Sequence, residues 1–174
     1  MKTLITGGVR SGKSRHAEAL LAQFPTVTYV APGPTTADDP DPDWAARIAE
    51  HRRRRPAGWI TVETSDLAGA LGTDGPVIVD CLGTWLTAAL DRGRLWEAPS
   101  GAAVEAVHGL LDQAKAALAK RDQVVLVTNE VGLGVVPAHR SGRLFRDLLG
   151  LVNQELAAEC DEVHLVVAGR VLVL

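Results

Sequence analysis

Short apolar runs alternate with longer stretches of helical periodicity along this chain. Five of the runs lack the polar alternation of half-exposed strands, so they predict strands that are covered on both faces. Regular alternation of such strands with helices favours an α/β fold, in which a mainly parallel central sheet is flanked by helices. The predicted strands span residues 3–6, 27–31, 59–63, 76–80 and 123–130.

The C-terminal segment departs from this alternation. Its sequence, EVHLVVAGRVLVL (162–174), predicts two strands around a tight turn at Ala168-Gly169, which adds an antiparallel hairpin at an edge of the sheet. No shift in composition marks a boundary, so residues 1–174 are expected to form one domain, with the Pro- and Asp-rich stretch 32–43 as an internal loop. The predicted helices span residues 13–23, 42–55, 66–72, 84–91, 102–121 and 143–159.

Composition and charge exclude several classes of protein. The 174 residues carry a formal net charge of −3, which argues against sequence-independent binding of nucleic acid. No apolar run approaches the length of a membrane-spanning helix, and the N-terminus lacks a signal-peptide core. The two cysteines, Cys81 and Cys160, form no CxxC pair and predict reduced, buried thiols. We therefore expect a soluble, cytoplasmic protein.

The segment GGVRSGKS (7–14) fits the phosphate-binding pattern G-x-x-x-x-G-K-[ST]. A predicted strand precedes it and a predicted helix follows it, as the motif requires. Glycines let the backbone curl so that its N–H groups face phosphate oxygens. In this motif Lys13 contacts the β and γ phosphates and the Ser14 hydroxyl binds Mg²⁺. The alternative, a glycine turn beside a surface lysine, accounts for neither the spacing nor the flanking elements.

A phosphate loop of this kind is normally paired with an acidic residue at the end of a neighbouring strand, which organises magnesium. Asp80 ends the strand VIVD and is the first candidate; Glu130, after VVLVTN, is the second. Asp80 has an alternative role as a helix cap, because DCLGTW leads into a predicted helix. His16, in the helix after the loop, either approaches the nucleotide or packs against the protein.

Four consecutive arginines follow a histidine in EHRRRRPAGW (50–59). At about 100 degrees per residue, one face of the predicted 42–55 helix carries both apolar and basic side chains. A neutral imidazole among guanidiniums is a competent nucleophile, and arginines can clamp a phosphate chain. Spacing alone nevertheless favours a partly buried structural histidine on a basic helix. The shared face, about one third of the circumference, holds Trp44, Arg47, Ile48, His51 and Arg55.

Several longer segments together resemble one family. The chain is similar from end to end to the bifunctional adenosylcobinamide kinase / adenosylcobinamide-phosphate guanylyltransferase family of cobalamin biosynthesis. The resemblance rests on LITGGVRSGKSRHAEAL (4–20), RI-x-x-H (47–51) leading into RP-x-x-W-x-T-x-E (55–63), DCLGTWLT (80–87), VLVTNEVGLGVVP (125–137) and FRDLLGLVNQELAAECDEVHLVVAG (145–169).

The resemblance implies two reactions, a RecA-like P-loop fold and a homotrimer. The first reaction transfers the γ-phosphate of ATP or GTP, with Mg²⁺, to the hydroxyl of the aminopropanol arm of adenosylcobinamide. The second transfers GMP from GTP to adenosylcobinamide phosphate through a guanylylated histidine, and yields adenosylcobinamide-GDP and pyrophosphate. The RI-x-x-H match assigns that histidine to His51, with Lys13 as the other catalytic residue.

The resemblance also extends the set of nucleotide-binding residues beyond the phosphate loop. It adds the turn after the second strand, the arginine run and two acidic residues, with Ser14 and Asp80 as the metal ligands. The full set is Gly7, Gly8, Val9, Arg10, Ser11, Gly12, Lys13, Ser14, Pro32, Gly33, Pro34, Arg52, Arg53, Arg54, Arg55, Glu63 and Asp80.

Overall fold

The structure, a computed structural model, describes residues 1–35 and 41–174. Within helix α2 (Pro42–Arg54) the side chains of Trp44, Arg47, His51 and Arg54 lie outside the described part. The central stretch of the predicted 32–43 loop, residues 36–40, lies outside it as well.

One seven-stranded sheet forms the centre of the molecule, in the order β3-β2-β4-β5-β1-β6-β7. Six strands are parallel, and only β7 is antiparallel, to β6. The predicted parallel sheet with an antiparallel edge hairpin is thereby confirmed. The strands are β1 (Lys2–Gly7), β2 (Thr28–Ala31), β3 (Ile60–Glu63), β4 (Val77–Asp80), β5 (Val124–Val127), β6 (Glu162–Val167) and β7 (Arg170–Val173).

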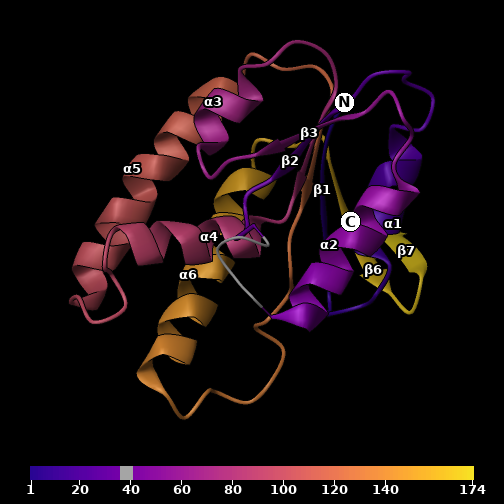
Figure 1. Ribbon diagram of the computed structural model, residues 1–174. Coiled ribbons are helices and arrows are strands. Elements are labelled where there is room, and N and C mark those ends of the chain that lie inside the picture. The colour runs from indigo at the N-terminus through magenta and orange to yellow at the C-terminus, as the bar shows by residue number, and fades with distance from the viewer. Residues whose placement is uncertain (36–40) are drawn as a thin grey trace.

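Helices cover both faces of the sheet. Figure 1 shows α3, α4, α5 and α6 on one side of the strands, and α1 and α2 on the other. The predicted helices are confirmed with shifted ends; α1, for example, stops at Leu20 because tight turns over residues 19–24 lead into Pro25. The remaining helices are α1 (Lys13–Leu20), α3 (Leu67–Leu71), α4 (Leu82–Arg92), α5 (Ser100–Leu118) and α6 (Arg140–Ala157).

Two apolar clusters, one on each face, hold the layers together. The larger cluster packs α3 to α6 onto the sheet through side chains such as Trp85, Leu111 and Leu149, all at most 1% exposed. The smaller one packs α1 onto the opposite face. Strands β1, β2, β4 and β5 contribute to both, since successive side chains point to opposite faces. In β4, for example, Val77 and Val79 join the larger cluster and Ile78 the smaller.

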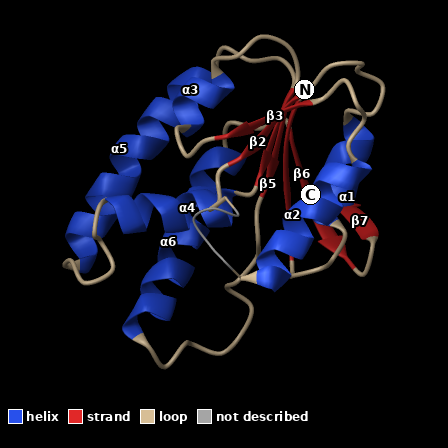
Figure 2. Cartoon of the chain, in the orientation of Figure 1, coloured by secondary structure: helices blue, strands red, loops and turns tan. Residues whose placement is uncertain are grey.

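This alternation decides where the functional side chains lie. Asp80 follows Ile78 by two positions, so it belongs to the face covered by α1. Parallel strands also end at a common edge, and this edge of an open α/β sheet is where ligands bind. Irregular segments leave the sheet here after β1, β2 and β5 (Figure 2). No helix in the described ranges is long and apolar enough to cross a membrane.

Candidate nucleotide site

The phosphate loop joins β1 to α1, and its glycines are required by geometry. Gly7 has φ +151°, and a Cβ there would lie 2.3 Å from the carbonyl oxygen of Val166 in β6. Gly12, the N-cap of α1, has φ +103°, which side chains other than glycine rarely adopt. The loop therefore closes against β6 and directs the N-terminus of α1 toward the carboxyl edge of the sheet, where its free N–H groups favour an anion.

Lys13 is held inside this loop. Its side chain is only 8% exposed, and Nζ donates a hydrogen bond of 2.7 Å to the carbonyl oxygen of Gly8. Burial lowers the pKa of Lys13, and the nearby Cys81 and Asp80 act in the opposite direction. The Lys13 ammonium group is thus held near Asp80, the acidic residue at the end of β4.

A cleft of about 770 Å³ opens at this edge of the sheet, within the size range of small-molecule sites. Two of its lining residues carry buried polar atoms that make no hydrogen bond within the described residues, Ser11 Oγ and Arg55 Nε. Both atoms are donors that suit phosphate oxygens. The predicted residues that line the cleft are Val9, Arg10, Ser11, Gly12, Lys13, Ser14, Gly33, Pro34, Arg52, Arg55, Glu63 and Asp80.

The predicted residues outside this lining have identifiable positions. Gly7 lies against Val166 of β6, the Gly8 carbonyl accepts the Lys13 hydrogen bond, and Pro32 is buried directly after β2. Arg53 does not reach the cleft; its side chain is 75% exposed and pairs with Glu50 at 2.6 Å. Arg54 and His51 belong to α2 through their backbones, and their side chains are outside the described part.

Helix α2 borders the cleft. Asp41 caps it by accepting a 2.9 Å hydrogen bond from the Asp43 N–H, as predicted. The helix ends before Arg55, whose extended backbone (ψ 139°) reflects the restriction imposed by the following proline. Among the described residues of this helix, five line the cleft: Asp43, Ala46, Ile48, Glu50 and Arg52. The helix that carries His51 therefore faces the phosphate loop across the same cavity.

The two predicted acids lie in different surroundings. Asp80 lines the cleft with Ser14, whereas the Glu130 carboxylate accepts a 2.6 Å hydrogen bond from the N–H of Gly132 in its own loop. The described residues contain no group of three or more His, Cys, Asp or Glu side chains placed to hold a metal. The oxygen donors of Ser14 and Asp80 suit magnesium, which takes its other ligands from phosphates and water.

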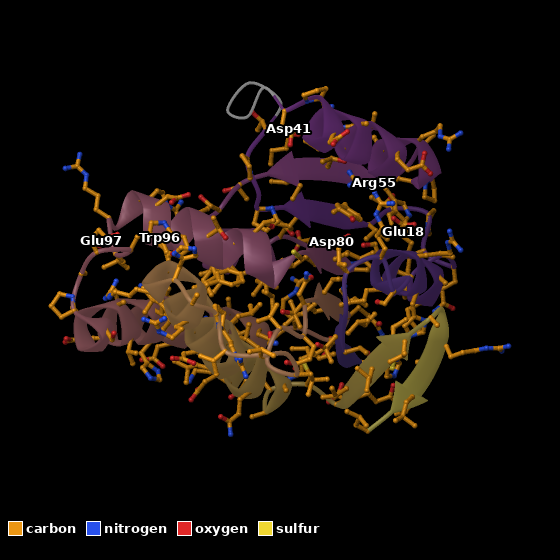
Figure 3. All side chains as sticks on the ribbon, turned by 90° about the horizontal axis from the view of Figure 1, so that it is seen from below. Glu18, Asp41, Arg55, Asp80, Trp96 and Glu97 are labelled. Atoms are coloured by element: carbon orange, nitrogen blue, oxygen red, sulfur yellow. The ribbon has the colours of Figure 1, made fainter. Side chains whose placement is uncertain are left out.

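Several site residues were missed by sequence reasoning. Tyr29, 1% exposed, donates a 2.6 Å hydrogen bond from its hydroxyl to Asp80 Oδ2. Burial raises the pKa of Tyr29 well above its usual range, and the Asp80 carboxylate adds to this shift, so the phenol stays protonated. The Arg55 guanidinium lies 3.4 Å from the centre of the Tyr29 ring, and Figure 3 shows Arg55 and Asp80 in the same part of the molecule. A tyrosine within an apolar strand gives no sequence signal for this role.

Asn129 was also missed as a lining residue, although its position gave a signal. It follows β5 at the carboxyl edge of the sheet, where ligands bind. Asn153 of α6 fixes this turn: its Nδ2 donates to the Asn129 carbonyl at 3.1 Å, and its Oδ1 accepts from Thr128 Oγ1 at 2.6 Å.

His16 takes the second of its two predicted roles. Its Nε2 lies 2.8 Å from Nδ1 of His164 in β6, and His164 Nε2 lies 2.9 Å from a carboxylate oxygen of Glu162. Burial lowers the pKa of His16, and His164 adds to that shift. His16 therefore ties α1 to β6 and does not line the cleft.

Sequence comparisons with known proteins all identify one family of nucleotide-using enzymes of cobalamin biosynthesis. A sequence profile of the family described as "Cobinamide kinase / cobinamide phosphate guanyltransferase" matches residues 3–174. The "bifunctional adenosylcobalamin biosynthesis protein CobU" of Salmonella typhimurium is 42% identical over 186 residues, which cover 97% of both chains. The Escherichia coli protein of the same name is also 42% identical, again with 97% of both chains covered. The related CobP protein of Pseudomonas aeruginosa is 39% identical over 97% of this chain and 94% of its own.

A solved structure shows the same fold at much lower identity. It comes from a study of an ATPase of the type III secretion system of pathogenic bacteria. The TM-score is 0.54 at 12% identity, and the match covers 94% of this chain and 50% of the other. The similarity supports the P-loop fold and carries no information about the substrate.

Proposed function

Because this chain belongs to the cobinamide kinase / cobinamide phosphate guanyltransferase family, we propose that it catalyses both reactions that the family description names. It phosphorylates adenosylcobinamide with ATP or GTP, and then transfers GMP from GTP to adenosylcobinamide phosphate. One observation supports both steps: a single cleft is lined by the phosphate loop on one side and by α2, the helix of His51, on the other.

In the kinase step, the substrate hydroxyl oxygen attacks the γ-phosphorus and releases its proton to solvent. A new P–O bond forms, the bond to the bridging β,γ oxygen breaks, and the nucleoside diphosphate leaves. Lys13, the N–H groups of the loop and Ser11 Oγ bind the phosphate oxygens and offset the charge that spreads over them. Ser14 and Asp80 would hold Mg²⁺, which when bound neutralises charge on the β and γ phosphates.

In the guanylyl step, an imidazole nitrogen of His51 attacks the α-phosphorus of GTP. The P–N bond forms as the bond to the α,β-bridging oxygen breaks, and pyrophosphate leaves. A phosphate oxygen of adenosylcobinamide phosphate then displaces His51 from the phosphorus and restores the free imidazole. Arg52 of α2 and Arg55, which directly follows α2, line the cleft. Their guanidinium groups are suited to stabilise the negative charge that develops on the phosphate oxygens.

Labelling with GTP that carries ³²P at the α position tests this assignment. The wild type should retain label through a phosphoramidate, which is labile to acid and stable to alkali. His51→Ala should lose the label while keeping kinase activity toward adenosylcobinamide. The matched control is His108→Ala, since His108 belongs to α5 on the opposite face of the sheet, and it should label normally. Label on His51→Ala would refute the nucleophile, and a wild type that never labels would reduce the protein to a kinase.

We further propose that the chain is a cytoplasmic homotrimer. The edge strand β7 supports self-association, because Val171, Leu172 and Val173 are each at least 42% exposed there. Two unpaired cysteines fit a reducing compartment. Analytical ultracentrifugation tests the trimer; a monomer at micromolar concentration would contradict it.

A further inference from the structure

A row of contacts crosses three strands next to the cleft. It begins at Thr61 in β3, whose Oγ1 accepts a 2.7 Å hydrogen bond from Arg55 Nη1. The Arg55 guanidinium lies over the Tyr29 ring of β2 at 3.4 Å, and the Tyr29 hydroxyl donates to Asp80 of β4 at 2.6 Å. The row thus connects the residue just after α2 with the acidic residue beside the phosphate loop.

Strand register explains why these side chains meet. Tyr29 lies opposite Thr61 in β3 and opposite Ile78 in β4. Asp80 is two positions beyond Ile78, so Tyr29 and Asp80 are diagonal neighbours on one face, a separation that a long aromatic side chain can bridge. Tyr29 is 1% exposed, and its ring packs in the apolar cluster under α1. A side chain confined in this way holds its hydroxyl at one point.

We propose that Tyr29 is a positioning residue: its hydroxyl fixes the Asp80 carboxylate for Mg²⁺, and its ring seats Arg55 beside the phosphates. This inference rests on the proposed function, because it takes Asp80 as a metal ligand. Partners that orient a metal ligand through hydrogen bonds typically change metal affinity by about 10- to 100-fold when they are removed. Tyr29 thereby supports both Asp80, beside the phosphate loop, and Arg55, which directly follows α2.

Lys13 and Glu18 carry charges in the neighbourhood of the Tyr29–Asp80 hydrogen bond. Lys13, across the phosphate loop, is near enough for the carboxylate to affect its pKa, but its Nζ donates to Gly8. Glu18 of α1 is near the Tyr29 hydroxyl and carries the same sign as Asp80. The hydrogen bond from Tyr29 reaches Asp80 from within the sheet, where Tyr29 is buried.

The test measures GTP binding by calorimetry in Mg²⁺ and in EDTA, and takes the ratio of the two dissociation constants. In Tyr29→Phe the ring remains under Arg55 and only the hydroxyl is lost. Affinity in EDTA should stay within about twofold of the wild type, while the gain from Mg²⁺ should shrink about tenfold. The matched control is Trp59→Phe, which removes a hydrogen bond to the Phe24 carbonyl from the same apolar cluster and should leave the ratio unchanged.

Asp80→Asn separates this inference from the proposed function. If Asp80→Asn keeps the wild-type ratio, Asp80 does not serve the metal, and both the assignment and the inference are wrong. If Asp80→Asn loses the Mg²⁺ gain while Tyr29→Phe keeps it, only the inference is overturned.

Tyr29→Leu tests the role of the ring. It should also weaken binding in EDTA, by about threefold or more, because Arg55 loses the aromatic surface on which it lies. Affinity equal to that of Tyr29→Phe would overturn this part of the proposal. Tyr29→Phe remains decisive for the hydroxyl if Tyr29→Leu does not fold.

Discussion

Asn153 fastens the turn after β5 to helix α6, and its replacement by leucine should be costly. The variant loses the hydrogen bonds to Thr128 Oγ1 (2.6 Å) and to the Asn129 carbonyl (3.1 Å). Each such bond contributes about 1 kcal/mol net, and a buried hydroxyl left without a partner costs about 1 kcal/mol or more in addition. Thr128 is 0% exposed, so water cannot replace the lost partner. We expect Asn153→Leu to lower the free energy of unfolding by about 2–3 kcal/mol.

Urea unfolding followed by circular dichroism measures this decrease in the free energy of unfolding. The same decrease should lower the melting temperature by about 5–10 °C for a chain of this size. Adding Thr128→Val to Asn153→Leu should recover about 1 kcal/mol, because the unpaired hydroxyl is removed. Gln154→Leu, an exposed neighbour on α6, is the control and should change stability by less than about 0.5 kcal/mol. Strict additivity of the two substitutions, or a loss below about 0.5 kcal/mol for Asn153→Leu, would show that these hydrogen bonds do not stabilise the turn.

Three further predictions concern charge and ionisation. Lys13→Ala should weaken GTP binding by about tenfold or more, measured by calorimetry, because the loop loses its one buried cation; unchanged affinity would remove Lys13 from the site. Arg52→Ala should weaken GTP binding several-fold, whereas Arg53→Ala should not, since only Arg52 lines the cleft; equal effects would contradict this assignment. Burial raises the pKa of the Cys160 thiol to about 12, so iodoacetamide at pH 8 should alkylate it about 1,000-fold more slowly in the native protein than in urea, in proportion to the thiolate fraction. Because the unfolded thiol ionises at a lower pH than the native one, the raised pKa stabilises the fold in full below about pH 8.5, and this contribution is lost as the pH rises toward 12. Rapid alkylation of Cys160 in the native protein would contradict the raised pKa.

Local patterns made most of the fold predictable. The continuous apolar runs of β1, β4 and β5 indicated buried parallel strands, and the Ala168-Gly169 turn indicated the antiparallel hairpin. Ends of elements were less predictable. The strand predicted over 123–130 stops at Val127, where its pairing with β1 and β4 ends, and Asn129 in the following turn lines the cleft.

The candidate site was predictable only where a motif fixes backbone geometry. The spacing of Gly7, Gly12 and Lys13 specifies a loop whose shape follows from its own residues. In the arginine run, by contrast, helical periodicity placed Arg55 on the face of His51 but did not identify Arg52 as a second residue of the site. The fold separates the arginines, because Arg52 and Arg55 border the cleft while Arg53 pairs with Glu50 in solvent.

Neighbouring residues and long matched segments were sufficient to predict the order of strands and helices, the phosphate loop and the family. Four contacts follow from the folded chain instead: Tyr29 with Asp80, Arg55 with Tyr29, Asn153 with the turn at Asn129, and His16 with His164. These partners are 51, 26, 24 and 148 positions apart. Strand register and helix packing bring them together, and neither is encoded in any local stretch of the chain.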